Sequence, residues 1–181
     1  MPSIVNLLRL LRLMKINPKK GEISIDKKRV LVIPAAMIPE LINGMAKVVG
    51  KGGSISAIYI GSKSQSKAIV DIITGVYGEG ILDTEEGFKK VLKDLIPYLG
   101  YGRAELIKLD RDKPEVVVRM VGTPTTTEEK EISDEPCCHT ERGIVTGIVE
   151  HTIGKPCVGK EVKCQAMGDE YCEFVVNACE N

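Results

Sequence analysis

The sequence predicts an α+β fold in a single domain, with an antiparallel sheet packed against several helices. Apolar residues recur at helical spacing in several segments, and β-branched segments joined by short polar turns appear in the second half of the chain. The length of 181 residues is enough for one domain with a substantial core. Short turns between neighbouring strands favour antiparallel pairing.

The composition is that of a soluble globular protein, and its charge is balanced. Twenty-five basic residues face 25 acidic ones, so no overall charge attracts nucleic acid or an anionic membrane. The apolar run near the N-terminus is interrupted by Arg9 and Arg12 and is too short to span a bilayer. It also lacks the small-residue cleavage site of an export signal. We therefore expect a cytoplasmic protein with no membrane span and no nucleic-acid partner.

Residues 1–20 are predicted to form an N-terminal amphipathic helix, and residues 21–181 a ligand-binding domain. Asn6, Arg9, Arg12 and Lys15 lie at three-residue steps, which places one polar stripe on a helix whose other surface is apolar. So wide an apolar face needs a partner. We expect it to dock on its own domain or on a second subunit, giving a homodimer; the alternative is an anchor on a membrane surface.

The middle of the chain alternates between predicted strands and helices. Residues 22–34 are expected to form two short strands or one interrupted strand, and residues 35–49 a helix. A glycine-rich turn at 50–53 leads into a predicted strand at 54–62 and a helix at 63–77. Residues 84–98 give the clearest amphipathic helix. Two strands follow at 103–110 and 114–121, separated by a polar turn.

The last third of the chain is predicted to contain a polar connector, a helix and a β-hairpin. Residues 122–136 are rich in Thr and Glu without hydrophobic periodicity, which indicates a solvated connector or, alternatively, a mobile cover over a pocket. A helix is expected from about 137 to 153. A hairpin then pairs residues 160–166 with 170–176 across a turn at Met167, Gly168 and Asp169.

The distribution of cysteines predicts a metal site. All six lie between residues 137 and 179, and Cys138, Glu161, Cys164 and Cys172 follow the spacing C-x22-E-x2-C-x7-C. The hairpin brings Cys164 and Cys172 together, and Cys138 arrives from the start of a helix, where exposed N–H groups favour a thiolate. Four protein ligands are typical of a structural zinc site with no position open to water.

Other interpretations of these residues stay open on the sequence alone. Residues three apart on a regular strand point to opposite faces, so Glu161 and Cys164 share an ion only if the backbone is irregular there. In a regular strand, His139 or Cys137 becomes the better fourth ligand. A Cys164–Cys172 disulfide, buried free thiols, or a catalytic Cys-His pair beginning at Cys137 are further alternatives.

From Cys138 onward the sequence resembles the 4-vinyl-reductase domain family. The resemblance rests on CHTERGIVTGI and on GKPCVGKEVKCQAMGDEYCEF, with weaker agreement upstream in SAIYIGS and LGYGRAEL. It implies a fold similar to haem nitric-oxide-binding domains and vesicle-tethering subunits. In phenol-sensing members of that family zinc is held by residues that match Cys138, Glu161, Cys164 and Cys172. The absence of tryptophan in this chain departs from the aromatic-lined pocket of those sensors.

Three functions are compatible with these observations. The first is a small cytoplasmic zinc-containing protein that binds a hydrophobic small molecule, such as a hydrocarbon, in an apolar pocket. We expect that pocket to be lined by helices near residues 69–77 and 88–98 and by the strand at 116–121. The second is a reductase acting on a vinyl or other unsaturated group of a tetrapyrrole-like substrate, although the chain has no dinucleotide-binding motif. The third is a protein–protein assembly module.

Overall fold

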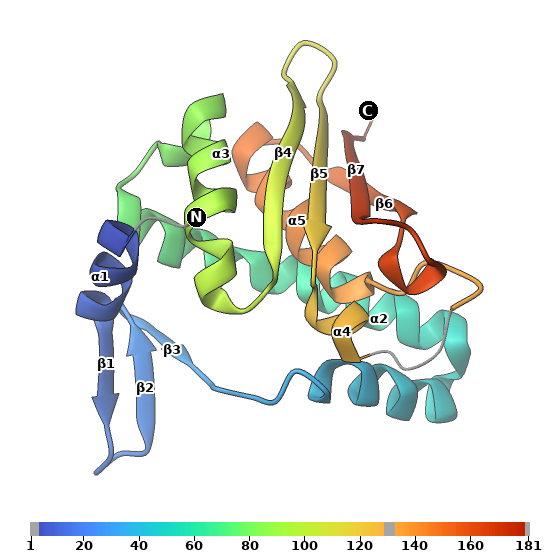
Figure 1. Ribbon diagram of the computed structural model, residues 1–181, viewed down its shortest axis with the longest axis horizontal. Coiled ribbons are helices and arrows are strands. Elements are labelled where there is room, and N and C mark those ends of the chain that lie inside the picture. Colours follow the sequence, from blue (N-terminus) through green and yellow to red (C-terminus); the bar gives the residue numbers. More distant parts are fainter. Residues whose placement is uncertain (1–3, 129–132, 180–181) are drawn as a thin grey trace.

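The computed structural model describes residues 4–128 and 133–179, and it confirms the α+β class with antiparallel sheets packed on helices (Figure 1). The α-helices are α1 (Ile4–Leu13), α2 (Met37–Tyr77), α3 (Glu85–Asp94), α4 (Pro124–Glu128) and α5 (His139–Ile153). The strands are β1 (Met14–Asn17), β2 (Glu22–Ile25), β3 (Lys28–Val30), β4 (Arg103–Asp110), β5 (Glu115–Val121), β6 (Cys157–Lys163) and β7 (Cys172–Ala178). Three short 3₁₀ helices are η1 (Ile81–Asp83), η2 (Ile96–Leu99) and η3 (Gln165–Met167).

The large sheet has the strand order β4-β5-β7-β6, and every neighbouring pair in it is antiparallel. The turn between β4 and β5 forms because Asp110 Oδ1 accepts hydrogen bonds from the backbone N–H groups of Asp112 and Lys113. Burial alternates along β5 and along most of β7, with Val116, Val118 and Met120 buried on β5. The sheet therefore has one face on the core and one toward solvent.

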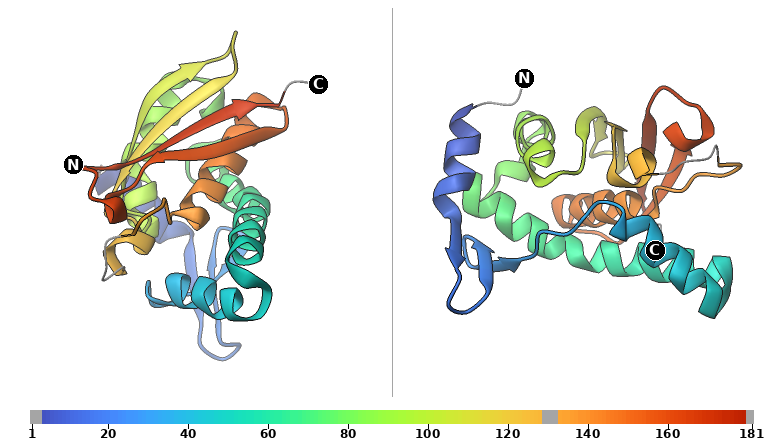
Figure 2. Two further views of the ribbon diagram at one scale, coloured as in Figure 1. Left: turned by 90° about the vertical axis from the view of Figure 1, so that its right-hand side faces the viewer. Right: turned by 60° about the horizontal axis from the view of Figure 1, so that its bottom comes forward.

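Helices cover the inner face of the sheet, with α5 packed between the sheet and α2 (Figure 2). The close approach of α2 and α5 depends on two glycines of α5. A Cβ atom at Gly143 would lie 2.6 Å from the carbonyl oxygen of Tyr59, and one at Gly147 would lie 2.5 Å from that of Lys63. The absence of a side chain at both positions lets the two helix backbones approach each other closely.

The strand predicted at residues 54–62 is wrong, because this segment is the central part of α2. The expected break at the glycine-rich turn is present, since Gly50 has φ 77° and ψ 163° inside the helix. Its β-branched residues suggested a strand. Instead Ser54, Ser62 and Ser66 are buried at helical spacing, and Ser62 and Ser66 lie against the two glycines of α5. Tertiary packing of these small residues outweighs local propensity.

The N-terminal helix packs differently from the predicted polar stripe. Asn6 is buried, and its Nδ2 donates a 2.7 Å hydrogen bond to Oδ2 of the buried Asp94 in α3. Asn6 and Leu10 are thus the inward residues of α1, which continues into the three-stranded sheet β1-β2-β3. Four large apolar side chains of α1 are at least half exposed: Ile4, Val5, Leu8 and Leu11. The apolar face that the sequence predicted is therefore largely uncovered.

Other predicted elements agree with the structure over most of their length. The helix at 84–98 is α3 followed by η2, the strands at 103–110 and 114–121 are β4 and β5, and the helix at 137–153 is α5. The predicted connector at 122–136 contains α4, and Thr123 just before this helix and Thr125 within it are buried rather than solvated. Residues 129–132 of that connector lie outside the described residues. Among the described helices, none combines the length and apolarity needed to cross a bilayer.

Candidate metal centre

The structure brings Cys138, Glu161, Cys164 and Cys172 together at one end of the large sheet. Cys138 is the residue before α5, Glu161 lies in β6, Cys164 follows β6, and Cys172 begins β7. One sulfur or carboxylate oxygen from each lies within 4.8 Å of every other, and all four residues are buried. Chain segments separated by more than 20 residues thus contribute donor atoms to a single point.

An irregular backbone lets Glu161 and Cys164 face the same point. The register between β6 and β7 shifts between Glu161 and Lys163, which is the irregularity that the spacing required. After β6 the chain turns through η3, where Gly168 adopts φ 94°. Asp169 holds this turn, because its carboxylate accepts a 2.8 Å hydrogen bond from the backbone N–H of Cys164.

Hydrogen bonds fix the carboxylate of Glu161 and leave one of its oxygens free to bind. Oε2 accepts a 2.9 Å hydrogen bond from the backbone N–H of Cys138 at the start of α5. Oε1 is buried and has no hydrogen-bond partner. An unsatisfied buried carboxylate oxygen is costly, and a cation among the sulfurs would satisfy it.

The separations between sulfurs match those expected around one ion. The Sγ atoms of Cys138 and Cys172 are 3.5 Å apart, and those of Cys138 and Cys164 are 4.0 Å apart. Two thiolates bound to one tetrahedral zinc at about 2.3 Å lie about 3.8 Å from each other. These two separations suit thiolates that share one ion, and the four residues could hold a metal.

The electrostatics of the cluster would favour a bound cation. Hydrogen bonds from Cys137, Cys138 and Cys172 lower the pKa of the Cys164 thiol. Burial, followed by the charge of Cys164, raises the pKa of Glu161 to about 8. Negative charge on one donor thus opposes ionisation of the next, and a divalent cation would remove that opposition.

Two residues next to the cluster were open as alternative ligands. His139 is buried, its Nδ1 has no partner, and burial lowers its pKa to about 4. Cys137 is partly exposed, and its Sγ lies 3.8 Å from that of Cys164. No spacing signal pointed to Cys137 beyond its adjacency to Cys138. All six cysteines lie within the described residues and are free thiols.

A small cavity lies in the core beside α5. Its volume is about 20 Å³, and its lining is Leu92, Ile96, Tyr101, Ala104, Met120, Glu141, Ile144, Val145 and Ile148. The segments at 88–98 and 116–121, which were predicted to line a pocket, both contribute residues to this lining. The segment at 69–77 contributes none, and residues of α5 line the cavity instead. Both Glu141 carboxylate oxygens accept hydrogen bonds from the Thr125 hydroxyl, so this buried acid is held at the helix start.

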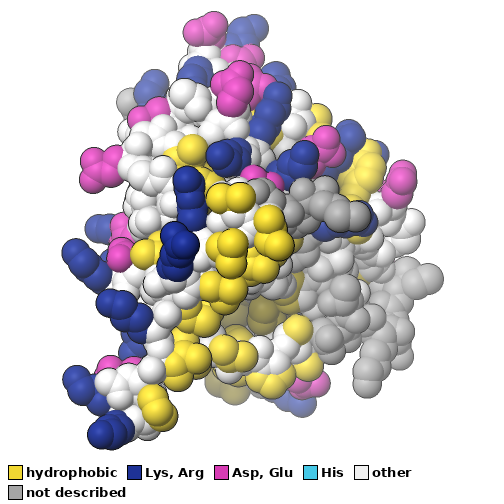
Figure 3. Space-filling model, turned by 60° about the vertical axis from the view of Figure 1, so that its left-hand side comes forward, with side chains coloured by type: hydrophobic (Ala, Val, Ile, Leu, Met, Phe, Trp, Pro, Cys, Tyr) yellow, Lys and Arg dark blue, Asp and Glu magenta, His cyan; other side chains and the backbone are white. Residues whose placement is uncertain are grey.

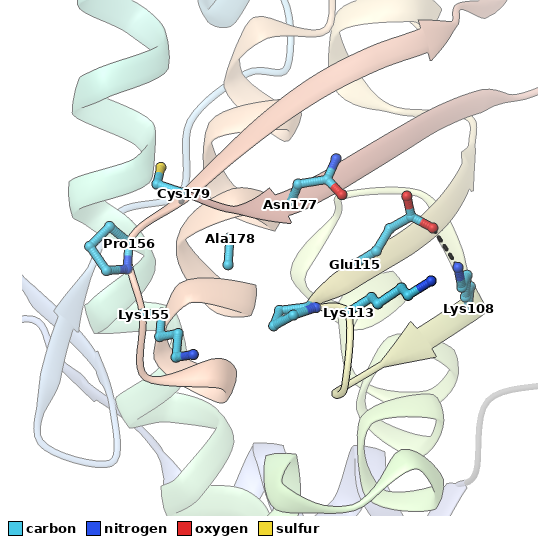
Figure 4. A pocket seen from close by; sticks show the side chains of 9 residues that line it. Lys108, Lys113, Glu115, Lys155, Pro156, Asn177, Ala178 and Cys179 are labelled. Atoms are coloured by element: carbon cyan, nitrogen blue, oxygen red, sulfur yellow. Dashed lines mark hydrogen bonds and ion pairs between the residues drawn. The ribbon is translucent and has the colours of Figure 1, made fainter. Parts of the chain in front are cut away.

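A larger groove lies at the opposite end of the large sheet, near the β4–β5 turn (Figure 4). Its volume is about 870 Å³, it is open to solvent, and Lys108, Lys113 and Lys155 stand around it. Lys108 is paired with Glu115 at 2.6 Å. Its charged rim does not match the apolar pocket that the sequence predicts.

A comparison with known protein families finds a match that includes the cysteine-rich segment. Residues 116–178 match the family model for the vinyl-4-reductase domain. An uncharacterised protein of Methanocaldococcus jannaschii is 32% identical over 87 residues, which are 48% of this chain and 46% of that protein. The match thus spans about half the length of this relative.

Solved structures share the fold at low sequence identity. The phenol-responsive sensory domain of the transcription activator PoxR, solved with phenol, superposes with a TM-score of 0.80 at 14% identity, covering 97% of this chain and 89% of that one. A trafficking protein particle complex subunit 3 from Naegleria fowleri, covalently bound to palmitic acid, superposes with a TM-score of 0.59 at 11% identity, covering 81% of this chain and 95% of that one. An H-NOX domain from Shewanella oneidensis superposes with a TM-score of 0.50 at 11% identity, covering 99% of this chain and 90% of that one.

These neighbours confirm the expected likeness to haem nitric-oxide-binding and vesicle-tethering folds. A vinyl-4-reductase family protein from Methanocaldococcus jannaschii has a TM-score of 0.53 at 18% identity, covering 99% of this chain and 98% of that one. The resemblance drawn from the cysteine-rich sequence is therefore confirmed: residues 116–178 of this chain match the vinyl-4-reductase domain family.

Proposed function

We propose that this protein is a cytoplasmic homodimer that binds a hydrophobic small molecule and is stabilised by one structural zinc ion per chain. The single observation that carries the proposal is the apolar cavity between α3, β4, β5 and α5. Ligand sites in compact domains are concave, mostly apolar and enclosed between elements of the core. The fold is shared with a sensory domain solved with phenol, which supports the same kind of role.

The cavity is small in this structure, so the proposed ligand must displace side chains that line it. A volume of about 20 Å³ is comparable to the space needed for one water molecule. Met120 and Leu92 are unbranched at Cβ and reach other rotamers more readily than the β-branched residues around them. We therefore expect a compact apolar ligand whose entry moves these two side chains.

The residues of the metal centre fit zinc, and we propose Cys138, Glu161, Cys164 and Cys172 as its ligands. The orphaned Oε1 of Glu161 and the spacing of the sulfurs support this choice. Zinc bound by four protein ligands contributes folding energy and leaves no position for a substrate. Its role here would be to tie the β6–β7 hairpin to the start of α5. Free thiols throughout are typical of the reducing cytoplasm.

The uncovered face of α1 supports the homodimer. Figure 3 views the side of the molecule that carries α1 and the small sheet, and hydrophobic side chains gather along it. Ile4, Leu8 and Leu11 are 70%, 51% and 50% exposed, and Leu31 and Val32 in the following segment are 78% and 85% exposed. Contiguous apolar surface of this kind marks an interface. We propose that residues 4–20, together with this segment, form the dimer contact, while the binding domain begins at residue 21.

Native mass spectrometry of freshly purified protein tests the proposal in one measurement. We expect a dimer with one zinc per chain and, in part of the sample, an added organic mass. A nicotinamide or flavin mass with turnover of a vinyl substrate would instead favour the reductase. A metal-free protein would refute the zinc assignment, and a dimer that carries no small molecule, even after incubation with apolar one-ring compounds, would refute the binding role.

Matched variants test the zinc site and the dimer contact separately. Cys172→Ser should lose zinc, whereas Cys179→Ser, which changes the exposed cysteine beyond the cluster, should keep it. Leu8→Lys should yield monomers by sedimentation velocity, while Arg9→Lys, one residue away on the same helix, should remain dimeric. A dimer that survives Leu8→Lys would place the interface elsewhere.

A further inference from the structure

A fourth thiol lies beside the metal centre, next to the three thiols and one carboxylate of the proposed ligand set. Cys137 precedes Cys138, and its Sγ lies 3.8 Å from that of Cys164. Cys138, Cys164 and Cys172 each have no exposed surface, whereas Cys137 is partly exposed. Of the thiols in this cluster, Cys137 is thus the one that a small molecule in solvent reaches first.

We propose that Cys137 and Cys164 form a redox pair, in which a peroxide oxidises the two thiols to a disulfide and thereby removes one ligand from the metal centre. The proposal rests on the proposed zinc site for its consequence. The formation of the disulfide rests only on the position of the two sulfurs. A bond between them withdraws Cys164 and leaves three donors, Cys138, Glu161 and Cys172.

The geometry requires little movement. A disulfide has a sulfur–sulfur length of about 2.05 Å, so the two Sγ atoms must approach by somewhat less than 2 Å. Both residues lie outside regular strands and helices, Cys137 before α5 and Cys164 between β6 and η3. We therefore expect the bond to need a change of side-chain rotamer and a small shift of these two loops.

The chemistry balances with hydrogen peroxide as the oxidant. The sulfur of Cys137 attacks one peroxide oxygen, the O–O bond breaks, and a sulfenic acid forms while the other oxygen leaves as water. The sulfur of Cys164 then attacks the sulfur of Cys137, the S–O bond breaks, and the second water leaves. Two electrons pass from the sulfurs to the peroxide, and the protons come from the thiols and from solvent. A dithiol reductant reverses the reaction.

The order of attack follows from exposure. The sulfurs of Cys138 and Cys172 are 3.5 Å apart, closer than those of Cys137 and Cys164, but neither of these two residues is accessible to solvent. Cys179 is exposed, yet it follows β7 at the end of the sheet opposite to the metal centre. Cys137 alone combines access from solvent with a neighbouring sulfur of the cluster, because susceptibility to oxidation depends on exposure as well as on thiolate character.

The test treats zinc-loaded wild-type protein with one equivalent of hydrogen peroxide per chain. Released zinc is followed with a chromogenic chelator, and the disulfide is mapped by mass spectrometry of peptides prepared without reductant. We expect a Cys137–Cys164 peptide to appear as zinc is released, and dithiothreitol with added zinc to restore the starting state. Cys137→Ser should release zinc about tenfold more slowly. Cys179→Ser is the matched control and should behave as wild type.

Two results would overturn the redox pair: Cys137→Ser releasing zinc as fast as wild type, or a mapped disulfide that excludes Cys137. The zinc content of untreated wild type and of Cys137→Ser keeps this test separate from the proposed function. If both proteins contain the same amount of zinc, Cys137 is not needed for the metal site, whatever the result of the peroxide treatment. If wild type contains no zinc, the proposed metal site fails, and peptide mapping alone still decides whether Cys137 and Cys164 pair.

Discussion

Replacing Gly143 by alanine should destabilise the protein, because this position is one of the two where the backbone of α5 closely approaches α2. An added Cβ would lie 2.6 Å from the Tyr59 carbonyl oxygen, 2.7 Å from Ser62 Cβ and 3.0 Å from the Lys63 backbone nitrogen, whereas ordinary contact begins at 3.4 Å. None of these atoms is the free end of a flexible side chain. The two helices must therefore separate by most of an ångström.

The expected magnitude combines two opposing effects. Overpacking of a well-packed contact costs about 1–3 kcal/mol. Alanine in a helix interior gains about 1 kcal/mol over glycine. Because the clash is with backbone on the opposite helix, we place the cost near the upper end and expect a net loss of about 2 kcal/mol in the free energy of unfolding.

Gly61→Ala is the matched control. Gly61 is exposed in α2, and an added Cβ would have no atom within 4 Å. Only the helix propensity changes there, so this variant should be more stable than wild type by up to about 1 kcal/mol. Urea unfolding of both zinc-loaded variants, followed by circular dichroism, gives the comparison. The reasoning would be refuted if Gly143→Ala were as stable as Gly61→Ala.

Three further predictions concern the metal centre and two buried polar contacts. Removing the proposed zinc ion with a chelator should lower the melting temperature strongly, since a structural zinc contributes several kcal/mol, and calorimetry with and without chelator would contradict this if the curves coincided. Asn6→Ala leaves the carboxylate of Asp94, which is 9% exposed, without its donor and should cost about 1.5–3 kcal/mol in urea unfolding; an unchanged midpoint would show that the contact is dispensable. Burial raises the pKa of Glu141 above its ordinary value of 4.5, so its contribution to stability is present below that value and is lost as the pH rises through the folded pKa. Glu141→Gln should therefore flatten the fall in stability toward high pH, and parallel curves of unfolding midpoint against pH for the two proteins would rule this out.

The candidate site was more predictable from the sequence than the fold around it. Cysteine and glutamate side chains can bind a metal in many structural contexts, so the residue types and the spacing of these residues were enough to predict one cluster. The structure brings all four together: Cys138, Glu161, Cys164 and Cys172. The bulge near Glu161 also followed from the sequence, because two donors three residues apart on a strand cannot otherwise share a point.

Features that depend on distant partners were not predictable. The middle of α2 contains β-branched residues with a period that suits either a strand or a helix, and only packing against Gly143 and Gly147 of α5 decides between them. Asn6 is likewise polar on any sequence scale, but a single acceptor, Asp94, 88 residues away, turns it inward. The position of Cys137 beside Cys164 was also not predictable, because its adjacency to Cys138 does not say where its side chain points.

The strand order of the large sheet has a consequence for synthesis of the chain on the ribosome. β7 follows every other strand in sequence, yet it lies between β5 and β6, so β6 pairs with no other strand of this sheet until β7 arrives. A nascent chain that stalls before Cys172 would present the unpaired edge of β5, with its run of valines, as a template for aggregation. Such a chain would also lack the sulfur of Cys172, so the proposed metal site could be completed only after the start of β7 has been synthesised.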